Sequence, residues 1–365
     1  MIVSLYFFKL ENSAGGAERS VVWLSNKLVS NGHIVHLISL DRPTSKIFYT
    51  INKRVLWHKI GFRNDSFGKL AKLIKLTSLL KSIKSDVFIG FVMGGDKVVY
   101  ASCLLSKTKL IAAERNSPIM YSIKLSKISK FLHLNLFFLA KKIVTQFSAY
   151  KSGYPFYLRK KIVAIPNPVK PAREIAKVNL KNGKQYTLLC VSRFDKQKNL
   201  ESLIMAFSML AKECNNWNLK IIGNGILKPD IQNLINNLDL NKRIKIIDSK
   251  TDVESEYAKA HLFCLPSIWE GFPNSLAEAL SAGLPSIGFL SCDGVNKLIK
   301  HGKNGILIKK NNHENLAIGI KSLMKNSSLR LKMSKKAILI SSEYREDEIY
   351  KSWEKVLYDT IYAKK

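Results

Sequence analysis

The sequence predicts an α/β protein of two domains, each a parallel, Rossmann-like β-sheet with helices on both faces. Three observations carry this prediction. Short runs of β-branched and aromatic residues alternate with segments of about 10–20 residues that suit helices. The length of 365 residues suits two domains of about 100–200 residues each. Near the middle, residues 165–171 contain three prolines, which end regular structure and mark a boundary.

The expected strands follow the apolar runs in chain order. We expect them at residues 2–8, 33–40, 86–91, 110–113, 142–145 and 162–165 in the first half, and at residues 186–191, 219–222, 244–247, 262–265 and 285–288 in the second half. These runs have the length of buried strands, and most segments between them have the length of helices. The tail from residue 344 is expected to be a helix, because Ile349, Trp353, Val356 and Ile361 recur near helical spacing.

The predicted domains are residues 1–168, residues 169–343, and a C-terminal helix, residues 344–365, that packs back on the first domain. Ligands of such sheets bind beyond the carboxyl ends of the strands, so we expect the two domains to face each other across a ligand-binding cleft. The longest uncharged apolar run spans ten residues, whereas a membrane-spanning helix needs about 20. The first strand also lacks the features of a signal peptide. We therefore expect a cytoplasmic protein without a transmembrane helix.

The chain is strongly basic, with 59 Lys and Arg against 27 Asp and Glu and a formal net charge of +32. The excess concentrates in residues 1–168, which hold 27 of the basic and 7 of the acidic residues. A codon bias toward lysine explains a basic chain but not this asymmetry, whereas an anionic membrane surface or a nucleic acid as partner would explain it. Five widely spaced cysteines without metal-ligand spacing indicate reduced thiols and no metal site.

Two segments that follow expected strands carry groups suited to phosphate. Gly15 and Gly16 precede a helix, where glycine allows a ligand to approach the backbone and the helix N-terminus attracts an anion. Arg193 and Lys198 follow a strand, where a planar guanidinium and an ammonium could clamp a diphosphate. Ordinary structure explains each segment as well: a plain βα turn in the first case and a solvated charged loop in the second.

The most specific segment lies in the C-terminal half. Glu270 is expected in a loop and Glu278 on the helix that follows, with Asn274 as the cap of that helix. Backbone N–H groups of Phe272, Asn274 and Ser275 would suit a phosphate. The two carboxylates would accept hydrogen bonds from sugar hydroxyls. The alternative is a capping role for Glu270 and a solvated position for Glu278.

With these residues, the chain resembles the retaining, nucleotide-sugar-dependent glycosyltransferases of family 4, which have the two-domain GT-B fold. Glu270 and Glu278 match the family's Glu-x7-Glu pattern, and Arg193 and Lys198 match its Arg-x4-Lys loop. Its Gly-Gly-x-Glu-Arg opening is met by residues 15–19, and residues 282–287 and 301–308 continue the pattern. The resemblance spans nearly the whole chain and is most specific in the C-terminal half.

The resemblance implies a role for each matched residue. Glu278 would hold the ribose hydroxyls and Glu270 those of the donor sugar, while Arg193 and Lys198 would neutralise the diphosphate leaving group. Further donor contacts would come from Gly16, Gly223, Gly271, Phe272, Pro273, Asn274 and Ser275, with Thr251, Asp252 and Val253 bordering the base.

The N-terminal half departs from the family at one place. Many relatives carry a histidine after the fourth or fifth strand, whereas this chain has Glu114, Arg115 and Asn116 there. These three residues and Gly15 are the candidates for contacts with the acceptor or the sugar. The chain also lacks the Asp-x-Asp motif with which many glycosyltransferases hold a metal. We therefore expect no metal and no cofactor, with the two basic side chains stabilising the leaving group instead.

The sequence thus predicts a hexosyltransferase that moves a hexose or N-acetylhexosamine, with retention, from a nucleoside-diphosphate sugar, most plainly a UDP-sugar. The expected acceptor is a lipid-linked glycan in surface polysaccharide or lipopolysaccharide biosynthesis. The basic and apolar residues 121–142, together with the lysine-rich residues 69–84, favour peripheral contact with the inner face of the cytoplasmic membrane. The alternative is a buried helix with solvated lysines, which is the favoured interpretation of residues 134–140 taken alone. Two alternatives stay open: a nucleotide-sugar epimerase of the same fold, and a basic nucleic-acid-binding protein. Because the basic residues are scattered and no nucleic-acid-binding motif is present, no specific nucleic acid is expected.

Overall fold

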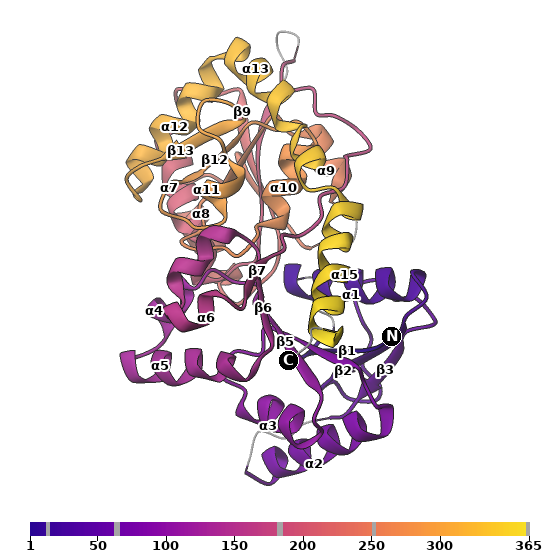
Figure 1. Ribbon diagram of the computed structural model, residues 1–365. Coiled ribbons are helices and arrows are strands. Elements are labelled where there is room, and N and C mark those ends of the chain that lie inside the picture. The colour runs from indigo at the N-terminus through magenta and orange to yellow at the C-terminus, as the bar shows by residue number, and fades with distance from the viewer. Residues whose placement is uncertain (12–14, 62–65, 181–184, 250–252, 363–365) are drawn as a thin grey trace. The chain divides into compact units, whose positions relative to one another are not determined.

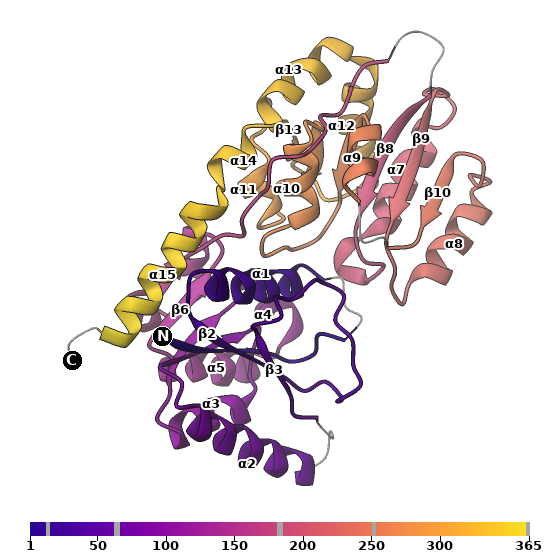
Figure 2. The ribbon, with the colours of Figure 1, turned by 90° about the vertical axis from the view of Figure 1, so that its right-hand side faces the viewer.

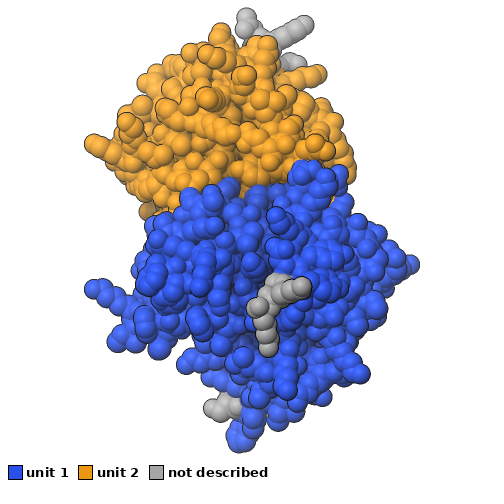
Figure 3. All heavy atoms as spheres, viewed as in Figure 1, with its two compact units in different colours: residues 1–167, 347–365 blue, residues 168–346 orange. Residues whose placement is uncertain are grey.

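The computed structural model describes residues 1–11, 15–61, 66–180, 185–249 and 253–362. The chain forms two compact units, which Figures 1 and 3 show: unit 1 comprises Met1–Asn167 and Asp347–Lys365, and unit 2 comprises Pro168–Glu346. The first division falls inside the proline-rich segment, next to the boundary that the sequence predicts. The second division falls between residues 346 and 347, slightly later than the start of the predicted C-terminal helix.

Unit 1 is built on a seven-stranded sheet with the strand order β3-β2-β1-β4-β5-β6-β7. All neighbouring strands run parallel, so their carboxyl ends lie at one edge of the sheet. The strands are β1 (Ile2–Phe7), β2 (Ile34–Ser39), β3 (Leu56–Lys59), β4 (Val87–Phe91), β5 (Lys109–Ala113), β6 (Lys142–Thr145) and β7 (Ile162–Ala164). The order reverses between β1 and β4, and ligands of open parallel sheets bind at such a switch point.

Helices cover both faces of this sheet (Figure 2). Helices α1 (Gly16–Ser30) and α15 (Glu346–Tyr362) pack on one face, where their apolar residues share a core with β1 and β4. Helices α2 (Ser66–Ile83) and α3 (Lys97–Leu105) pack on the other face, where a second core forms. The remaining helical elements are α4 (Ile119–Lys124), α5 (Lys127–Leu136), η1 (Phe137–Leu139), η2 (Ser148–Gly153) and α6 (Phe156–Arg159).

Helix α15 completes the core of unit 1 although it lies far from the rest of that unit in the sequence. Its residues Ile349, Trp353, Val356 and Leu357 are buried and recur at the three- and four-residue spacing of one helix face. The Trp353 ring stacks on Phe91 of β4 at a centroid distance of 6.0 Å. The apolar face of α15 is therefore the face that packs on unit 1.

Unit 2 is built on a six-stranded parallel sheet with the strand order β10-β9-β8-β11-β12-β13. Its strands are β8 (Tyr186–Val191), β9 (Trp217–Ile222), β10 (Ile244–Ile247), β11 (Leu262–Leu265), β12 (Ser286–Phe289) and β13 (Gly305–Ile308). The order reverses between β8 and β11, the two central strands. The helical elements of this unit are η3 (Lys196–Lys198), α7 (Leu200–Leu210), α8 (Lys228–Asn237), α9 (Glu254–Lys259), α10 (Asn274–Ser281), α11 (Val295–Leu298), α12 (His313–Lys325), α13 (Ser327–Ala337) and α14 (Ile340–Glu343).

The prediction of two Rossmann-like α/β domains is confirmed, with one additional strand in each sheet. Strands β3 and β13 were not expected, and each lies at an edge of its sheet. Strand β3 pairs on one side only and is partly exposed, so it does not read as an apolar run. Strand β13 is an apolar run, Gly-Ile-Leu-Ile, but has only 4 residues. Over the described ranges, no helix is both long and apolar enough to cross a membrane.

Candidate active site

The loops after the two central strands of unit 2 lie against each other. The loop after β8 turns through η3, where the Asp195 carboxylate accepts a hydrogen bond from the Lys198 N–H at 3.2 Å. Gln197 then joins this loop to the loop after β11: its side chain donates to the Trp269 carbonyl at 2.8 Å, and its own carbonyl accepts from the Ile268 N–H at 2.9 Å. These bonds hold both loops at the switch point of the sheet.

Lys198 and Glu270 meet at this point. The Lys198 Nζ lies 2.5 Å from Glu270 Oε1, and the two side chains are only 13 % and 8 % exposed. The Ser267 hydroxyl donates a second hydrogen bond to the same oxygen at 2.7 Å. Water screens a buried pair less than a surface pair, so this site presents a fixed positive and a fixed negative group side by side.

Arg193 differs from Lys198 in being exposed. Its Nη2 lies 3.2 Å from the Asp195 carboxylate, and its side chain is 64 % exposed. An exposed ion pair of this kind contributes little to stability, so the guanidinium can exchange the carboxylate for an anionic ligand at small cost. The sequence grouped Arg193 with Lys198, and the structure places both in the loop after β8.

Gly223 and Gly225, in the loop after β9, allow that loop to approach the loop after β8. A Cβ on Gly223 would overlap the Ser192 carbonyl oxygen, and one on Gly225 would overlap the backbone of Phe194. The Phe194 N–H donates to the Asn224 carbonyl at 2.9 Å. Glycine is thus required at both positions because any larger residue would overlap the backbone of the neighbouring loop.

Helix α10 starts at Asn274, with Pro273 as the residue before the first turn. The expectation that Asn274 caps this helix is therefore wrong by one position, because Asn274 already has helical geometry. The segment of Gly271, Phe272 and Pro273 is buried, and the Phe272 ring packs edge-on against Tyr344 at 5.4 Å. Ser275 is half-buried in the first turn.

Glu278 lies on α10, one turn after its start. Its side chain is half-buried, and its Oε2 accepts a hydrogen bond from the Tyr257 hydroxyl at 2.9 Å. Tyr257 lies on α9 and was not anticipated from the sequence. Its hydroxyl orients the carboxylate, which can accept further hydrogen bonds because each carboxylate oxygen has two lone pairs.

Gly294, after β12, is a further residue that the sequence analysis missed. It has a φ of +84°, and a Cβ there would lie 2.8 Å from the Gly271 carbonyl oxygen and 3.0 Å from Glu270 Cβ. The neighbouring Asp293 carbonyl accepts from the Glu270 N–H at 3.0 Å. The Asp293-Gly294 pair is a turn signal that could have identified this support for Glu270.

In unit 1, Gly15 precedes α1 and accepts the first helical hydrogen bond, from the Arg19 N–H at 3.1 Å. A Cβ on Gly15 would overlap the Glu18 carboxylate, which therefore lies at the start of the helix. Gly16 is the first helical residue. A negative side chain is favourable at a helix N-terminus, so the chain itself places an anion beside the position expected for phosphate. Of the motif's neighbours, Ser13 and Ala14 lie outside the described residues, as do Thr251 and Asp252 of the expected base site.

Glu114, Arg115 and Asn116 follow β5, and the structure buries the first two. The Tyr121 hydroxyl donates to the Glu114 carboxylate. Burial raises the pKa of Glu114 to about 7, although the Tyr121 hydrogen bond opposes the shift. The Arg115 guanidinium donates to the Asn167 side chain and to the Ile165 carbonyl, and burial lowers its pKa to about 9.

Both charged groups thus have partners inside unit 1, whereas Asn116 is half-buried. The structure brings Glu114 and Arg115 together as an internal anchor of the segment after β5.

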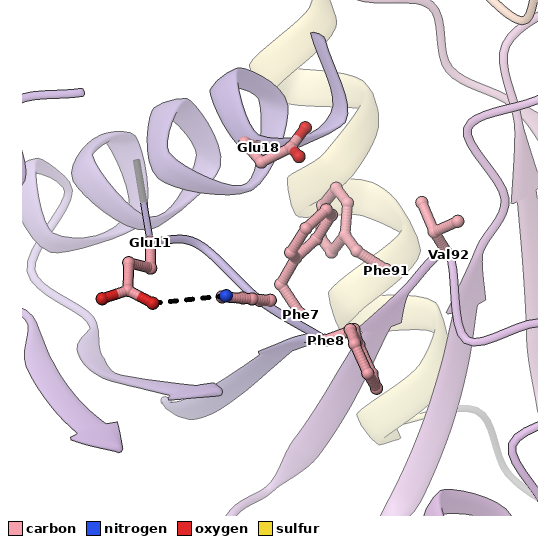
Figure 4. A pocket seen from close by; sticks show the side chains of 7 residues that line it. Phe7, Phe8, Glu11, Glu18, Phe91 and Val92 are labelled. Atoms are coloured by element: carbon pink, nitrogen blue, oxygen red, sulfur yellow. Dashed lines mark ion pairs between the residues drawn. The ribbon is translucent and has the colours of Figure 1, made fainter. Parts of the chain in front are cut away.

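A cavity of about 410 Å³ opens at the carboxyl ends of β1 and β4. It is lined by Phe7, Phe8, Lys9, Glu11, Glu18, Phe91 and Val92. Figure 4 shows the aromatic rings on one side of it, the Glu18 carboxylate on α1, and the Lys9–Glu11 ion pair of 3.3 Å. Apolar rings beside carboxylates suit a sugar, which has apolar C–H faces and hydroxyl donors. From the sequence, Phe7 and Phe8 were expected only as the end of a strand.

Across the part of the chain that the structure describes, no group of three or more His, Cys, Asp or Glu side chains could hold a metal ion. The described features are two Rossmann-like sheets with charged groups at the central strand ends of the second. They define the GT-B class of fold, and comparisons with known proteins agree.

The family model "Glycosyl transferases group 1" matches residues 171–339. A glycosyltransferase of Haemophilus influenzae without a characterised reaction is 30 % identical over 363 residues, which cover 96 % of this chain and 99 % of that protein. The α-1,4-N-acetyl-D-galactosaminyltransferase of Campylobacter jejuni that acts on a diphospho-undecaprenol-linked glycan is 26 % identical, covering 94 % and 95 %. The crystal structure of Anabaena Alr3699/HepE with UDP and glucose superposes with a TM-score of 0.78 at 14 % identity, covering 97 % and 98 %.

The chain belongs to the glycosyltransferases and is an enzyme of that class, with a group 1 glycosyltransferase domain at residues 171–339. The expectation of a glycosyltransferase with the GT-B fold is confirmed, and the epimerase alternative finds no support among these relatives.

Proposed function

We propose that the protein is a retaining hexosyltransferase of family 4 that transfers a hexose or N-acetylhexosamine from a UDP-sugar to a lipid-linked glycan in surface polysaccharide biosynthesis. The observation that carries the donor half of this proposal is the buried Lys198–Glu270 pair at the central strand ends of unit 2. Arg193 lies in the same loop as Lys198, and Glu278 lies on the helix that follows Glu270. These four residues supply two cations for a diphosphate and two acceptors for hydroxyl groups.

In the proposed reaction, the bond between the anomeric carbon and the diphosphate oxygen breaks, and the pair of electrons leaves with the diphosphate. Lys198 and Arg193 stabilise the negative charge that develops on the leaving oxygen. The acceptor hydroxyl attacks from the same face of the sugar, and its proton passes to the leaving phosphate oxygen. The configuration at the anomeric carbon is thereby retained without a nucleophile from the protein.

Glu270 is proposed to orient the donor sugar through its hydroxyl groups, and Glu278 to bind the ribose. The Lys198 ammonium keeps Glu270 in place before the donor binds, and the Tyr257 hydroxyl does the same for Glu278. Gly223 and the backbone of residues 271–275 would complete the donor site in unit 2. The proposal needs no metal and no other cofactor, since two side chains supply the positive charge at the leaving group.

The acceptor is proposed to bind to unit 1, at the cavity of Figure 4 and at Gly15 and Asn116. We assign Glu114 and Arg115 the task of holding the segment after β5 in place. Support for a lipid-linked acceptor comes from the Campylobacter jejuni relative, and support for UDP comes from the Anabaena HepE complex. The same acceptor class motivates the proposed location of the protein at the cytoplasmic membrane.

Thermal shift with UDP, GDP, CDP and a set of UDP-sugars, each in EDTA and in magnesium, tests this proposal. A ligand at about 100 times its Kd stabilises the folded state by about 2.7 kcal/mol, a shift that is readily measured. We expect a shift with UDP in EDTA, and its loss in Glu278→Gln. The matched control is Glu314→Gln, which changes an exposed carboxylate on α12 and should keep the UDP shift.

Each other outcome has a definite meaning. A shift with GDP or CDP alone would replace the donor, and a shift that requires magnesium would overturn the metal-free proposal. Consumption of a UDP-sugar without any acceptor, with a sugar epimer as product, would establish the epimerase. Absence of a shift with every nucleotide, together with retention of RNA at physiological salt, would favour the nucleic-acid-binding alternative.

A further inference from the structure

The outer face of α5 exposes large apolar side chains. Ile128 and Phe131 are 75 % and 64 % exposed, and Leu132 on the same helix and Phe138 of η1 are also more than half exposed. We call these four residues the α5 face. Soluble proteins expose single apolar residues often, but four neighbours on one helix and the turn after it form a patch, and such patches mark interaction sites.

The α5 face is held rigidly in this position. Leu134 and Phe137, on the opposite side of α5 and η1, are buried in the core of unit 1. The Ser126 side chain caps α5 by accepting a hydrogen bond from the Ser129 N–H at 3.2 Å. Figure 1 shows α4 and α5 as neighbouring magenta helices of unit 1. The apolar side chains therefore point outward because the helix is anchored by its other face.

The segment of the chain that contains the α5 face carries basic residues and no acidic residues. Residues 115–167 contain ten Lys and Arg and no Asp or Glu. Lys161 lies over the Phe138 ring, with its Nζ 4.5 Å from the ring centroid. Burial lowers the pKa of Lys161, and the neighbouring charges of Lys141 and Lys160 lower it further. Several lysine charges therefore lie close together beside an apolar patch. Such a surface is complementary to a partner that is both anionic and apolar.

We propose that the α5 face docks on an anionic phospholipid bilayer, with Ile128, Phe131, Leu132 and Phe138 entering the interface and the surrounding lysines contacting the headgroups. Nucleic acid would satisfy the charge but offers no apolar layer for these side chains, and a bilayer offers both. The inference rests on the proposed function, because a lipid-linked acceptor is the reason for docking, and it names the surface that meets the lipid.

Flotation with vesicles tests the inference. The wild type should bind vesicles of equimolar phosphatidylglycerol and phosphatidylcholine at physiological salt, and should bind vesicles of phosphatidylcholine alone much more weakly. The double variant Ile128→Ser/Phe131→Ser should bind the anionic vesicles about tenfold or more weakly, because two large apolar side chains are no longer there to transfer from water into the bilayer. The matched control is Met209→Ser/Ile318→Ser in unit 2, where the residues are 53 % and 67 % exposed. Its binding should stay within about twofold of the wild type.

The results separate this inference from the proposed function. The UDP thermal shift should be the same in both double variants and the wild type, because none of the four positions lies in the donor site. Wild-type protein that fails to float with anionic vesicles, or equal loss in the two double variants, would overturn the docking surface even if UDP binds. A wild-type dimer in analytical ultracentrifugation that Ile128→Ser/Phe131→Ser converts to a monomer would overturn it as well, since a second copy would then cover the α5 face. Vesicle binding without any nucleotide shift would support the docking surface and contradict the proposed donor.

Discussion

Replacing Lys198 by alanine tests two roles of this side chain. It forms an ion pair with Glu270 that stabilises unit 2, and it is proposed to stabilise the negative charge on the leaving diphosphate. In the wild type its Nζ lies 2.5 Å from Glu270 Oε1, and water reaches little of either side chain. Leaving one member of a buried pair without the other costs about 3–5 kcal/mol. Glu270 keeps the hydrogen bond from the Ser267 hydroxyl, which lowers the expected cost to about 2–3 kcal/mol.

This cost converts to a measurable change in thermal stability. A domain of the size of unit 2 loses about 2–4 °C in melting midpoint per kcal/mol, so Lys198→Ala should lower the midpoint by about 4–12 °C. Turnover should fall about 10²–10³-fold, the usual cost of removing one preorganised group that stabilises developing charge. The double variant Lys198→Met/Glu270→Leu leaves no buried charge and should recover most of the midpoint. It should not recover turnover.

The assay is scanning fluorimetry of the wild type, Lys198→Ala, Lys198→Met, Glu270→Leu and the double variant, combined with turnover of a UDP-sugar. Midpoint shifts that simply add would show that the two side chains do not stabilise each other, and the ion-pair argument would be wrong. Recovery of turnover together with stability in the double variant would refute the role of Lys198 at the leaving group. Lys321→Ala is the matched control: its exposed ion pair with Glu213 is 2.7 Å long, and its loss should cost at most about 1 kcal/mol.

Three further predictions concern other parts of the molecule. Gly223→Ala should abolish the UDP thermal shift, because its Cβ would overlap a backbone oxygen. The control Gly302→Ala, also at positive φ but with no atom within 4 Å of its Cβ, should keep the shift. An equal effect of the two substitutions on the UDP shift would refute the steric argument. Glu114 has a pKa raised from 4.5 to about 7 by burial, so its stabilising contribution is complete below pH 4.5 and is lost as the pH rises through 7. Glu114→Gln should therefore gain about 3 kcal/mol relative to the wild type between pH 4.5 and 8, and a midpoint difference that does not change with pH would contradict this. Trp353→Ala should destabilise unit 1 by about 3–5 kcal/mol, seen as faster proteolysis of unit 1, while a peptide map with unchanged cleavage would show that α15 is dispensable.

The layers of the fold could be predicted from the sequence because most of the strands are short, predominantly apolar runs. Residues 142–145, 186–191, 244–247 and 262–265 are strands with the bounds that the sequence predicts. The edge strand β3 could not be predicted in the same way. β3 has the sequence Leu-Trp-His-Lys and is partly exposed, so it lacks the uniform burial that makes the central strands recognisable.

The candidate site was predicted as a set of residues but not as a set of contacts. Lys198 and Glu270 were assigned separate tasks, and only the adjacency of β8 and β11 brings them together across 72 positions. Tyr257, the partner of Glu278, carries no sequence signal of its own. The burial of Glu114 could not be predicted from the sequence either. A residue directly after a strand can be buried or exposed, depending on how helices later in the chain pack against it.

The two-part composition of unit 1 has a consequence for biosynthesis. Its core needs α15, yet Trp353 follows its partner Phe91 by more than 250 positions, with the whole of unit 2 between them. On the ribosome, unit 2 is therefore complete and able to fold before unit 1 can close its core. Until α15 emerges, β1 and β4 present the apolar surface that α15 will cover, and transiently exposed apolar surface of this kind is prone to aggregation. A chain released before α15 would keep this surface exposed and would be prone to aggregation and proteolysis.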